Sequence, residues 1–168
     1  MSKTDLFELP GHLIRRVHQI STALFTEECS AFDLTAVQYA ALHTIRDNPG
    51  VDATRLSLLI AFDRSTLGDV LTRIEGKGWI LREPSPSDAR VKLLYIAPVG
   101  KEVLRRVEPG IQRVQKRLLA PLARDDREIL VKLLAQLAEA FGDDISGEEA
   151  HAGSSLPALA RRSSRSTS

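Results

Sequence analysis

A single cysteine, Cys29, stands in a chain of 168 residues, so an internal disulfide is impossible. No apolar run approaches the roughly 20 residues that a membrane-spanning helix needs. The first five residues also lack the apolar stretch of a secretory signal. The four histidines show no paired spacing typical of zinc sites, and neither a Gly-rich phosphate loop nor a nucleophile motif is present. We therefore expect a cytoplasmic protein that is not an enzyme, needs no cofactor or metal and has no membrane partner.

The composition fits one globular domain. Hydrophobic residues make up 43% of the chain and charged residues 27%, which allows one core and leaves little room for a second. The net charge of +1 neither requires nor excludes a nucleic-acid partner. We expect a flexible lead over residues 1–8 and one domain over residues 9–142. Residues 143–168 are rich in Ser, Ala, Gly and Arg and are expected to form a disordered tail.

The spacing of apolar residues predicts helices in six segments, at residues 10–29, 36–47, 53–61, 64–76, 99–121 and 125–141. Pro109 and Gly110 should kink or interrupt the fifth helix. Before that helix, two extended runs at residues 79–83 and 90–96 flank a turn rich in Pro, Ser and Asp, which predicts a β-hairpin. The expected fold class is mainly α with a small β-hairpin wing, that is, a winged helix-turn-helix.

The helix at 64–76 has the features of a DNA recognition helix. Apolar residues fall on one side, and the other side has small polar side chains that can approach base edges in the major groove. The candidate DNA contacts on this helix are Arg64, Ser65, Thr66, Asp69, Thr72 and Arg73. An ordinary solvated face would look similar, but the short helix before it and the basic hairpin after it favour DNA binding.

The predicted hairpin has an arginine at its tip that an acid can orient. Asp88 stands two positions before Arg90, and a charge-assisted bond between them would hold the guanidinium ready for a narrow minor groove. Arg82 and Lys92 are candidate phosphate contacts. The alternative is a surface ion pair of little consequence. Residues 51–95 contain seven basic and six acidic residues, so a dimer should combine two half-sites to bind well.

Four segments together resemble the MarR family of bacterial transcription regulators, and the resemblance covers about residues 9–141. The segments are Asp63 to Leu67, Leu71 to Gly78, Asp88 to Arg90 and Pro98 to Lys101. The resemblance implies a homodimer built from helices at about 10–29 and 99–141, with a DNA-binding lobe at about 51–97. It also implies repression at a palindromic double-stranded DNA operator, relieved by a small phenolic or carboxylate compound.

In finer detail, the sequence resembles one branch of that family and differs from the family pattern at two positions. Residues 9–16 look most like members that control catabolism of aromatic acids such as hydroxybenzoates or nicotinates. Pro98 replaces the usual polar residue before Gly100. Asp69 on the reading face would repel phosphate unless it accepts a hydrogen bond from a cytosine amino group.

In the family the ligand lies between the dimer helices and the winged domain, so the first two helices should supply its contacts. The candidate effector contacts are His12, Arg16 and Gln19 of the first helix and Gln38, Tyr39 and His43 of the second. The three in the first helix form one row beside an apolar stripe, and such a row could clamp an aromatic carboxylate. Equally, His12 and Arg16 could pair with acids at a dimer interface. His18 points elsewhere and is expected on the surface.

Two other functions remain as alternatives. A thiol-based peroxide sensor would use Cys29, but this residue follows two glutamates near a helix C-terminus, where acids and the helix dipole disfavour a thiolate. A winged-helix module for protein–protein interaction would have apolar residues on the outer face of the helix at 64–76. Ser65 and Thr72 are polar there, which favours DNA.

Overall fold

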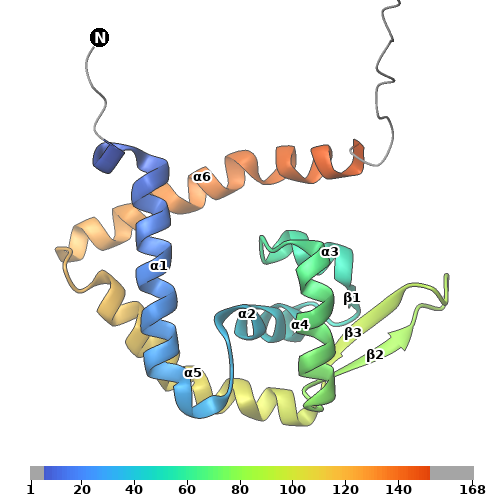
Figure 1. Ribbon diagram of the computed structural model, residues 1–168. Coiled ribbons are helices and arrows are strands. Elements are labelled where there is room, and N and C mark those ends of the chain that lie inside the picture. The colour runs from blue at the N-terminus through green and yellow to red at the C-terminus, as the bar shows by residue number, and fades with distance from the viewer. Residues whose placement is uncertain (1–5, 152–168) are drawn as a thin grey trace, which may run out of the picture. The chain divides into compact units, whose positions relative to one another are not determined.

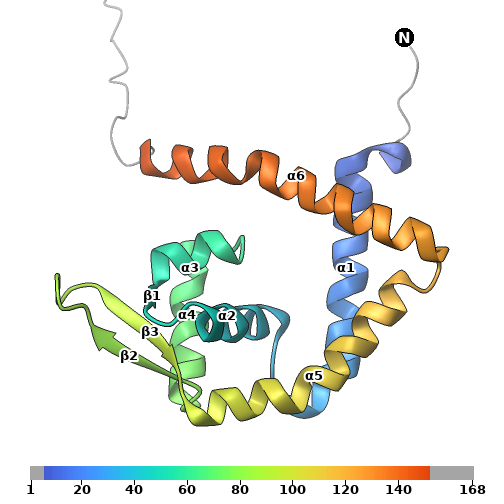
Figure 2. The same cartoon turned by 180° about the vertical axis from the view of Figure 1, so that it is seen from behind.

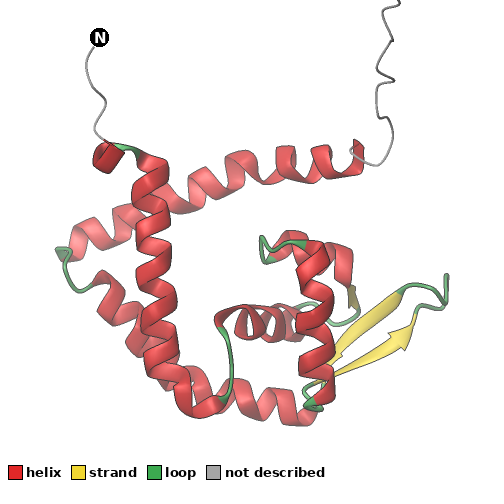
Figure 3. Ribbon diagram, viewed as in Figure 1, coloured by secondary structure: helices red, strands yellow, loops and turns green. Residues whose placement is uncertain are grey.

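The computed structural model describes residues 6–151, with side chains up to residue 140 (Figure 1). The chain divides into two units, one ending at Ala123 and one starting at Arg124. The six predicted helices and the predicted hairpin appear in the predicted order, and the expected fold class is confirmed (Figure 3). Over residues 6–151, no helix is both long enough and apolar enough to cross a membrane.

The first unit contains five α-helices, two 3-10 turns and three short strands within its described residues. They are η1 (Leu6–Glu8), α1 (Pro10–Cys29), η2 (Ser30–Phe32), α2 (Ala36–Asp47), β1 (Val51–Asp52), α3 (Ala53–Leu59), α4 (Arg64–Gly76), β2 (Ile80–Pro84), β3 (Lys92–Ile96) and α5 (Pro98–Leu119).

Helices α1 and α5 pack along each other (Figure 2). They approach closely at Gly110. A Cβ atom at Gly110 would lie 3.1 Å from the carbonyl oxygen of Glu28 and 3.2 Å from Sγ of Cys29, so only glycine fits without a shift. The helix α5 is continuous, so the expected interruption at Pro109 is absent. Its ribbon bends along its length instead (Figure 2), as expected where proline removes a backbone donor.

Ion pairs extend this contact toward the C-terminal end of α1. Arg113 Nε lies 2.6 Å from Glu28 Oε2, and Arg117 Nη1 lies 2.8 Å from Glu28 Oε1. These two guanidinium groups hold the pKa of the Glu28 carboxyl below its usual value. Arg117 also bonds to Glu27, so the two helices are joined by a charged network.

The lobe between α1 and α5 contains the helix-turn-helix and a three-stranded antiparallel sheet of order β1-β3-β2. The hairpin of β2 and β3 was predicted, whereas β1 was not, because two residues are too few to show a strand period. Side chains cap the helices as their sequence suggests: Thr35 forms a capping box at α2, Asp52 caps α3 and Asp63 caps α4. Helix α3 ends at Leu59, earlier than predicted, because Ala61 has a left-handed backbone with φ of 49°.

The core of this lobe joins α2, α3 and α4 to the sheet. Fully buried leucine and isoleucine side chains from each element meet there, among them Leu42, Leu56 and Leu71. Helix α5 joins the lobe at Gly100, where a Cβ atom would overlap the carbonyl oxygen of Trp79. Glycine is therefore required where α5 begins.

The second unit is the helix α6 (Arg124–His151), of which the side chains are described to residue 140. Five of its large apolar side chains are about half-exposed, from 43% for Leu134 to 55% for Val131, whereas Leu130 is partly buried. The helix runs to residue 151, beyond the predicted end at 141 and into the segment expected to be disordered. The rest of the predicted tail, residues 152–168, and residues 1–5 of the predicted lead lie outside the described residues.

Candidate nucleic-acid interface and effector pocket

Helix α4 separates its residues into a buried and an exposed face. Leu67, Val70, Leu71 and Ile74 are buried in the core. The exposed residues include the six predicted contacts, and the full set is Arg64, Ser65, Thr66, Gly68, Asp69, Thr72, Arg73, Glu75 and Gly76. The exposed face therefore offers short polar groups and two arginines at a spacing that suits a major groove.

The hydroxyl groups at the start of α4 are oriented by its N-cap. The Asp63 carboxylate accepts hydrogen bonds from the Ser65 hydroxyl, from the Thr66 backbone N–H at 2.9 Å and from the Thr66 hydroxyl at 2.9 Å. The Ser65 hydroxyl, followed by Thr66, lowers the pKa of Asp63 below its usual value. Because their protons face Asp63, both hydroxyls present acceptor lone pairs outward.

The wing tip contains the predicted Asp88–Arg90 pair. Arg90 Nε donates to Asp88 Oδ1 at 3.0 Å and Nη2 donates to Oδ2 at 2.9 Å, while the side chain of Arg90 remains 91% exposed. Arg90 accordingly holds the pKa of the Asp88 carboxyl below its usual value. Lys92 Nζ donates to the carbonyl oxygen of Ala89 at 3.2 Å. The guanidinium is thus oriented and accessible before any DNA arrives.

Arg82, the other candidate phosphate contact, lies differently. Its side chain is 26% exposed and turns toward α4, with Nε 2.9 Å from Glu75 Oε2 and Nη2 donating to Thr72 Oγ1 at 3.3 Å. Arg82 is therefore more buried than the other arginine side chains of this surface and already has partners within the protein.

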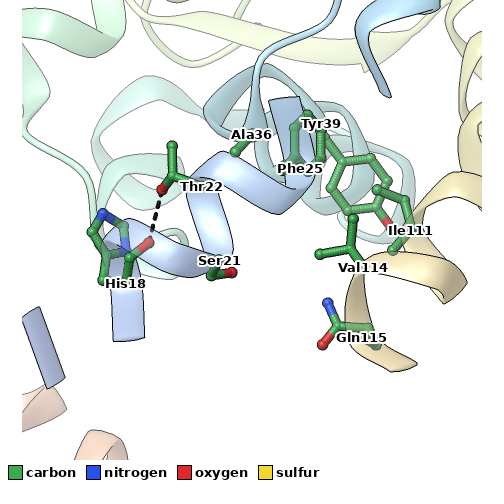
Figure 4. A pocket seen from close by; sticks show the side chains of 9 residues that line it. All are labelled: His18, Ser21, Thr22, Phe25, Ala36, Tyr39, Ile111, Val114 and Gln115. Atoms are coloured by element: carbon green, nitrogen blue, oxygen red, sulfur yellow. Dashed lines mark hydrogen bonds between the residues drawn. The ribbon is translucent and has the colours of Figure 1, made fainter. Parts of the chain in front are cut away.

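A pocket of about 150 Å³ lies between α1, α2 and α5 (Figure 4). It is lined by His18, Ser21, Thr22, Phe25, Ala36, Tyr39, Ile111, Val114 and Gln115. Phe25, Ile111 and Val114 supply apolar walls, while His18, Tyr39 and Gln115 supply polar groups. Burial raises the pKa of Tyr39, so its hydroxyl stays protonated at neutral pH and can donate a hydrogen bond.

Of the six predicted effector contacts, the structure places Tyr39 in this pocket and the others elsewhere. Arg16 and Gln19 are exposed on α1. The ring of His12 packs edge-on against Phe7 with 5.5 Å between centroids. The row that contains these three residues lies roughly 140° around α1 from the pocket-lining residues.

The remaining two predicted contacts have partners in α2 or at its start. Gln38 is 5% exposed, and its Oε1 accepts from the Thr35 backbone N–H at 3.1 Å as part of the capping box. His43 Nδ1 lies 3.2 Å from Asp47 Oδ2, and its ring lies 5.8 Å from that of Tyr39. His43 is thus next to the pocket rather than in it.

His18 lines the pocket and is also exposed on α1, as the sequence analysis expected. Residues 18, 21, 22 and 25 follow the i, i+3, i+4, i+7 spacing of one helix face, so the stripe was visible in the sequence. Because this stripe contains His, Ser and Thr beside Phe, it lacks the apolar periodicity that would mark a buried helix face. Gln115 could not be assigned, because nothing in its sequence surroundings indicates that α5 approaches α1 there.

Cys29 has the properties of a structural residue. Its side chain is fully buried beside Gly110, and burial raises the pKa of the thiol above its usual value. A peroxide-sensing cysteine needs an accessible thiolate, so this alternative is not favoured.

Comparison with known proteins agrees with this geometry. A model of the MarR family matches residues 34–92. The multiple antibiotic resistance protein MarR of Salmonella typhimurium is 32% identical over 141 residues, which cover 81% of this chain and 97% of that protein.

Two solved structures are similar over most of the chain. The PcaV transcriptional regulator from Streptomyces coelicolor, in complex with its natural ligand, has a TM-score of 0.72 and 32% identity, covering 83% of this chain and 99% of that one. A MarR mutant from E. coli, complexed with operator DNA, has a TM-score of 0.72 and 30% identity, covering 80% and 99%.

Proposed function

Since this chain belongs to the MarR family of transcription regulators and is not an enzyme, we propose that it is a homodimeric, cytoplasmic repressor that a small aromatic carboxylate releases from DNA. Its target is a palindromic operator in double-stranded DNA. The observation that carries this proposal is the exposed polar face of α4 beside an arginine that Asp88 holds ready at the wing tip. Operator DNA bound to the E. coli MarR mutant supports the same use of the fold.

Exposed apolar side chains support the dimer. Helix α1 exposes Leu13, Ile14, Val17 and Ile20 by 44–51%, and α6 exposes a comparable set. Apolar stripes of this kind on single helices are expected to be covered by a partner, and a second copy would supply the second half-site. We expect Leu134→Glu to abolish the sedimenting dimer, whereas Glu139→Gln on the same helix leaves it intact. A well-folded monomer of the wild-type protein would contradict the dimer.

Selection from a random pool of double-stranded DNA tests operator binding directly. We expect the protein to enrich an inverted repeat whose half-sites lie about 10 base pairs apart, one helical turn, or a multiple of it. Binding should weaken steeply with salt, because phosphate contacts release counterions. Failure to enrich any sequence would contradict the repressor proposal and leave the interaction-module alternative.

The pocket supports a small aromatic effector. A cavity of about 150 Å³ is known to accept benzene, so the pocket can take one aromatic ring. Phe25, Ile111 and Val114 would contact the ring, and His18 and Tyr39 could bond to a carboxylate or hydroxyl group. The predicted row at Arg16 lies on another face of α1 and would need the partner subunit to complete a site.

A thermal-shift screen with hydroxybenzoates and nicotinates tests the effector. A ligand at 100 times its dissociation constant adds about 2.7 kcal/mol of stability, which is easily detected. For an active compound, His18→Ala should weaken binding if the ring occupies the pocket. Arg16→Ala should weaken it if the original row binds the carboxylate, with Arg15→Ala as the matched control on the same helix. If no aromatic acid shifts the melting temperature, the effector class is wrong.

A further inference from the structure

The side chain of Arg82, in the middle of β2, links the wing to the recognition helix. In the β2–β3 register Arg82 stands opposite Leu94, whose side chain is 1% exposed. Residues directly opposite each other in an antiparallel pair project from the same face of the sheet. Arg82 therefore projects from the face that packs on the lobe, unlike the exposed Arg90 at the tip.

The guanidinium of Arg82 contacts two residues on one face of α4. Nε lies 2.9 Å from Glu75 Oε2, an ion pair that lacks hydrogen-bond alignment, and Nη2 donates to Thr72 Oγ1 at 3.3 Å. Thr72 Oγ1 in turn donates to the carbonyl oxygen of Gly68 at 2.9 Å, so its lone pairs are directed at Arg82. Positions 72 and 75 are one turn apart, so one guanidinium can contact both residues at once.

We propose that Arg82 is a positioning residue that fixes the wing relative to the recognition helix, and not a contact to phosphate. The proposal rests on the DNA-binding function proposed above. Beyond the pairing of β1 with Leu93 and Leu94 of β3, the wing is a two-strand hairpin. Such a hairpin is marginal by itself, so a bridge at Arg82 controls where its tip lies. With the bridge intact, Arg90 and the polar face of α4 keep the spacing that adjacent grooves of one half-site require.

A double-mutant cycle on the selected operator tests this role. Arg82→Lys keeps the positive charge but cannot bridge both partners, so we expect it to weaken binding about tenfold. Combined with Arg90→Ala, it should reduce the cost of losing Arg90 severalfold, because a misplaced tip contributes little. Glu75→Gln breaks the same bridge from the other side and should also weaken binding and reduce the cost of Arg90→Ala.

A phosphate contact predicts the opposite pattern and would overturn the proposal. Arg82→Lys would then bind nearly as well as wild type, and its effect would add to that of Arg90→Ala. Arg82→Met would lower the salt slope by about one unit, and Glu75→Gln would bind DNA more tightly because a repelling charge is gone.

A measurement without DNA separates this proposal from the proposed function. In the DNA-free protein, Arg82→Lys and Glu75→Gln should both speed amide hydrogen exchange in the wing, residues 84–92, while exchange in α2 stays as in wild type. Unchanged wing exchange in both variants would overturn the bridge even if operator binding is shown. Absence of any operator for wild type would contradict the repressor function alone, because the exchange experiment does not depend on it. Glu75 is exposed, so Glu75→Gln is expected to fold and can test the bridge even if Arg82→Lys folds poorly.

Discussion

The proposed DNA-reading surface and the pocket are built by contacts of different range along the chain. On α4 and the wing, polar groups are held by neighbours two or three residues away: Asp63 holds Ser65 and Thr66, and Asp88 holds Arg90. The pocket instead takes its lining from α1, α2 and α5, which are far apart in sequence (Figure 4). The surface on α4 and the wing can therefore keep its geometry when helix packing changes slightly, whereas the geometry of the pocket depends on that packing.

This difference suggests how an effector acts. A ligand among α1, α2 and α5 would alter how these helices pack and leave the short-range contacts of the reading groups intact. Its effect on DNA would then be to move whole half-sites rather than to disturb single contacts. Substitutions that affect one region, both regions or the link between them can test this view.

The largest effect is expected where α5 joins the lobe, because both regions depend on that joint. Gly100→Ala would place a methyl group against the carbonyl oxygen of Trp79, and backbone atoms cannot move aside easily. We expect a loss of about 1–3 kcal/mol in the free energy of unfolding, or more, measured by urea denaturation. Gly11→Ala is the control, since nothing lies within 4 Å of a Cβ atom there. Equal stability of the two variants would show that the joint is looser than the structure indicates.

Arg90→Ala should affect the reading surface alone. Its side chain is 91% exposed in the DNA-free protein, so we expect no change in melting temperature and about 10- to 100-fold weaker operator binding at fixed salt. Arg105→Ala is the matched control, because Arg105 forms a similar exposed pair with Glu102 on α5. If both variants bind DNA like wild type, the wing does not touch the operator.

The same difference in range explains what could be predicted from the sequence. Helix caps such as Thr35 and Asp63 and the Asp88–Arg90 pair involve residues two or three apart, and their geometry follows from local rules. The helices and the hairpin were predicted for the same reason. The misplaced end of α3 reflects the left-handed backbone of Ala61, which no local propensity favours.

The pocket could not be predicted in the same way. Its lining depends on how closely α5 approaches α1, and that approach is set at Gly110, whose neighbours Glu28 and Cys29 are distant in sequence. A row of residues on one helix, such as that containing Arg16, shows which side chains share a face. It does not show which face meets another helix, so the sequence could not connect His18 with the pocket.

Lys77 links the two regions and should control their coupling. Its Nζ donates to the carbonyl oxygen of Asp33 at 2.6 Å and to Asp33 Oδ2 at 2.7 Å, which ties the end of α4 to the connection between α1 and α2. We expect Lys77→Met to bind effector alone and operator alone as wild type does. The factor by which effector lowers operator affinity should, however, be about threefold to tenfold smaller than in wild type. Titrating operator with and without effector measures this factor. An unchanged factor would mean that the coupling takes another route.

The smallest effect is expected from pH, through the cap that orients the reading hydroxyls. Hydrogen bonds from Ser65 and Thr66 hold the pKa of Asp63 below its usual value of 3.8. A carboxyl whose pKa is lower in the folded state stabilises the fold above the unfolded pKa, and this contribution is lost as pH falls through the folded pKa. Asp63→Asn can still cap the helix but cannot titrate. Between pH 5 and pH 3, we therefore expect the melting temperature of wild type to fall slightly more than that of Asp63→Asn. Parallel curves for the two proteins would show that the Asp63 charge contributes nothing to α4, and the hydroxyls of Ser65 and Thr66 would then have to be oriented by the DNA itself.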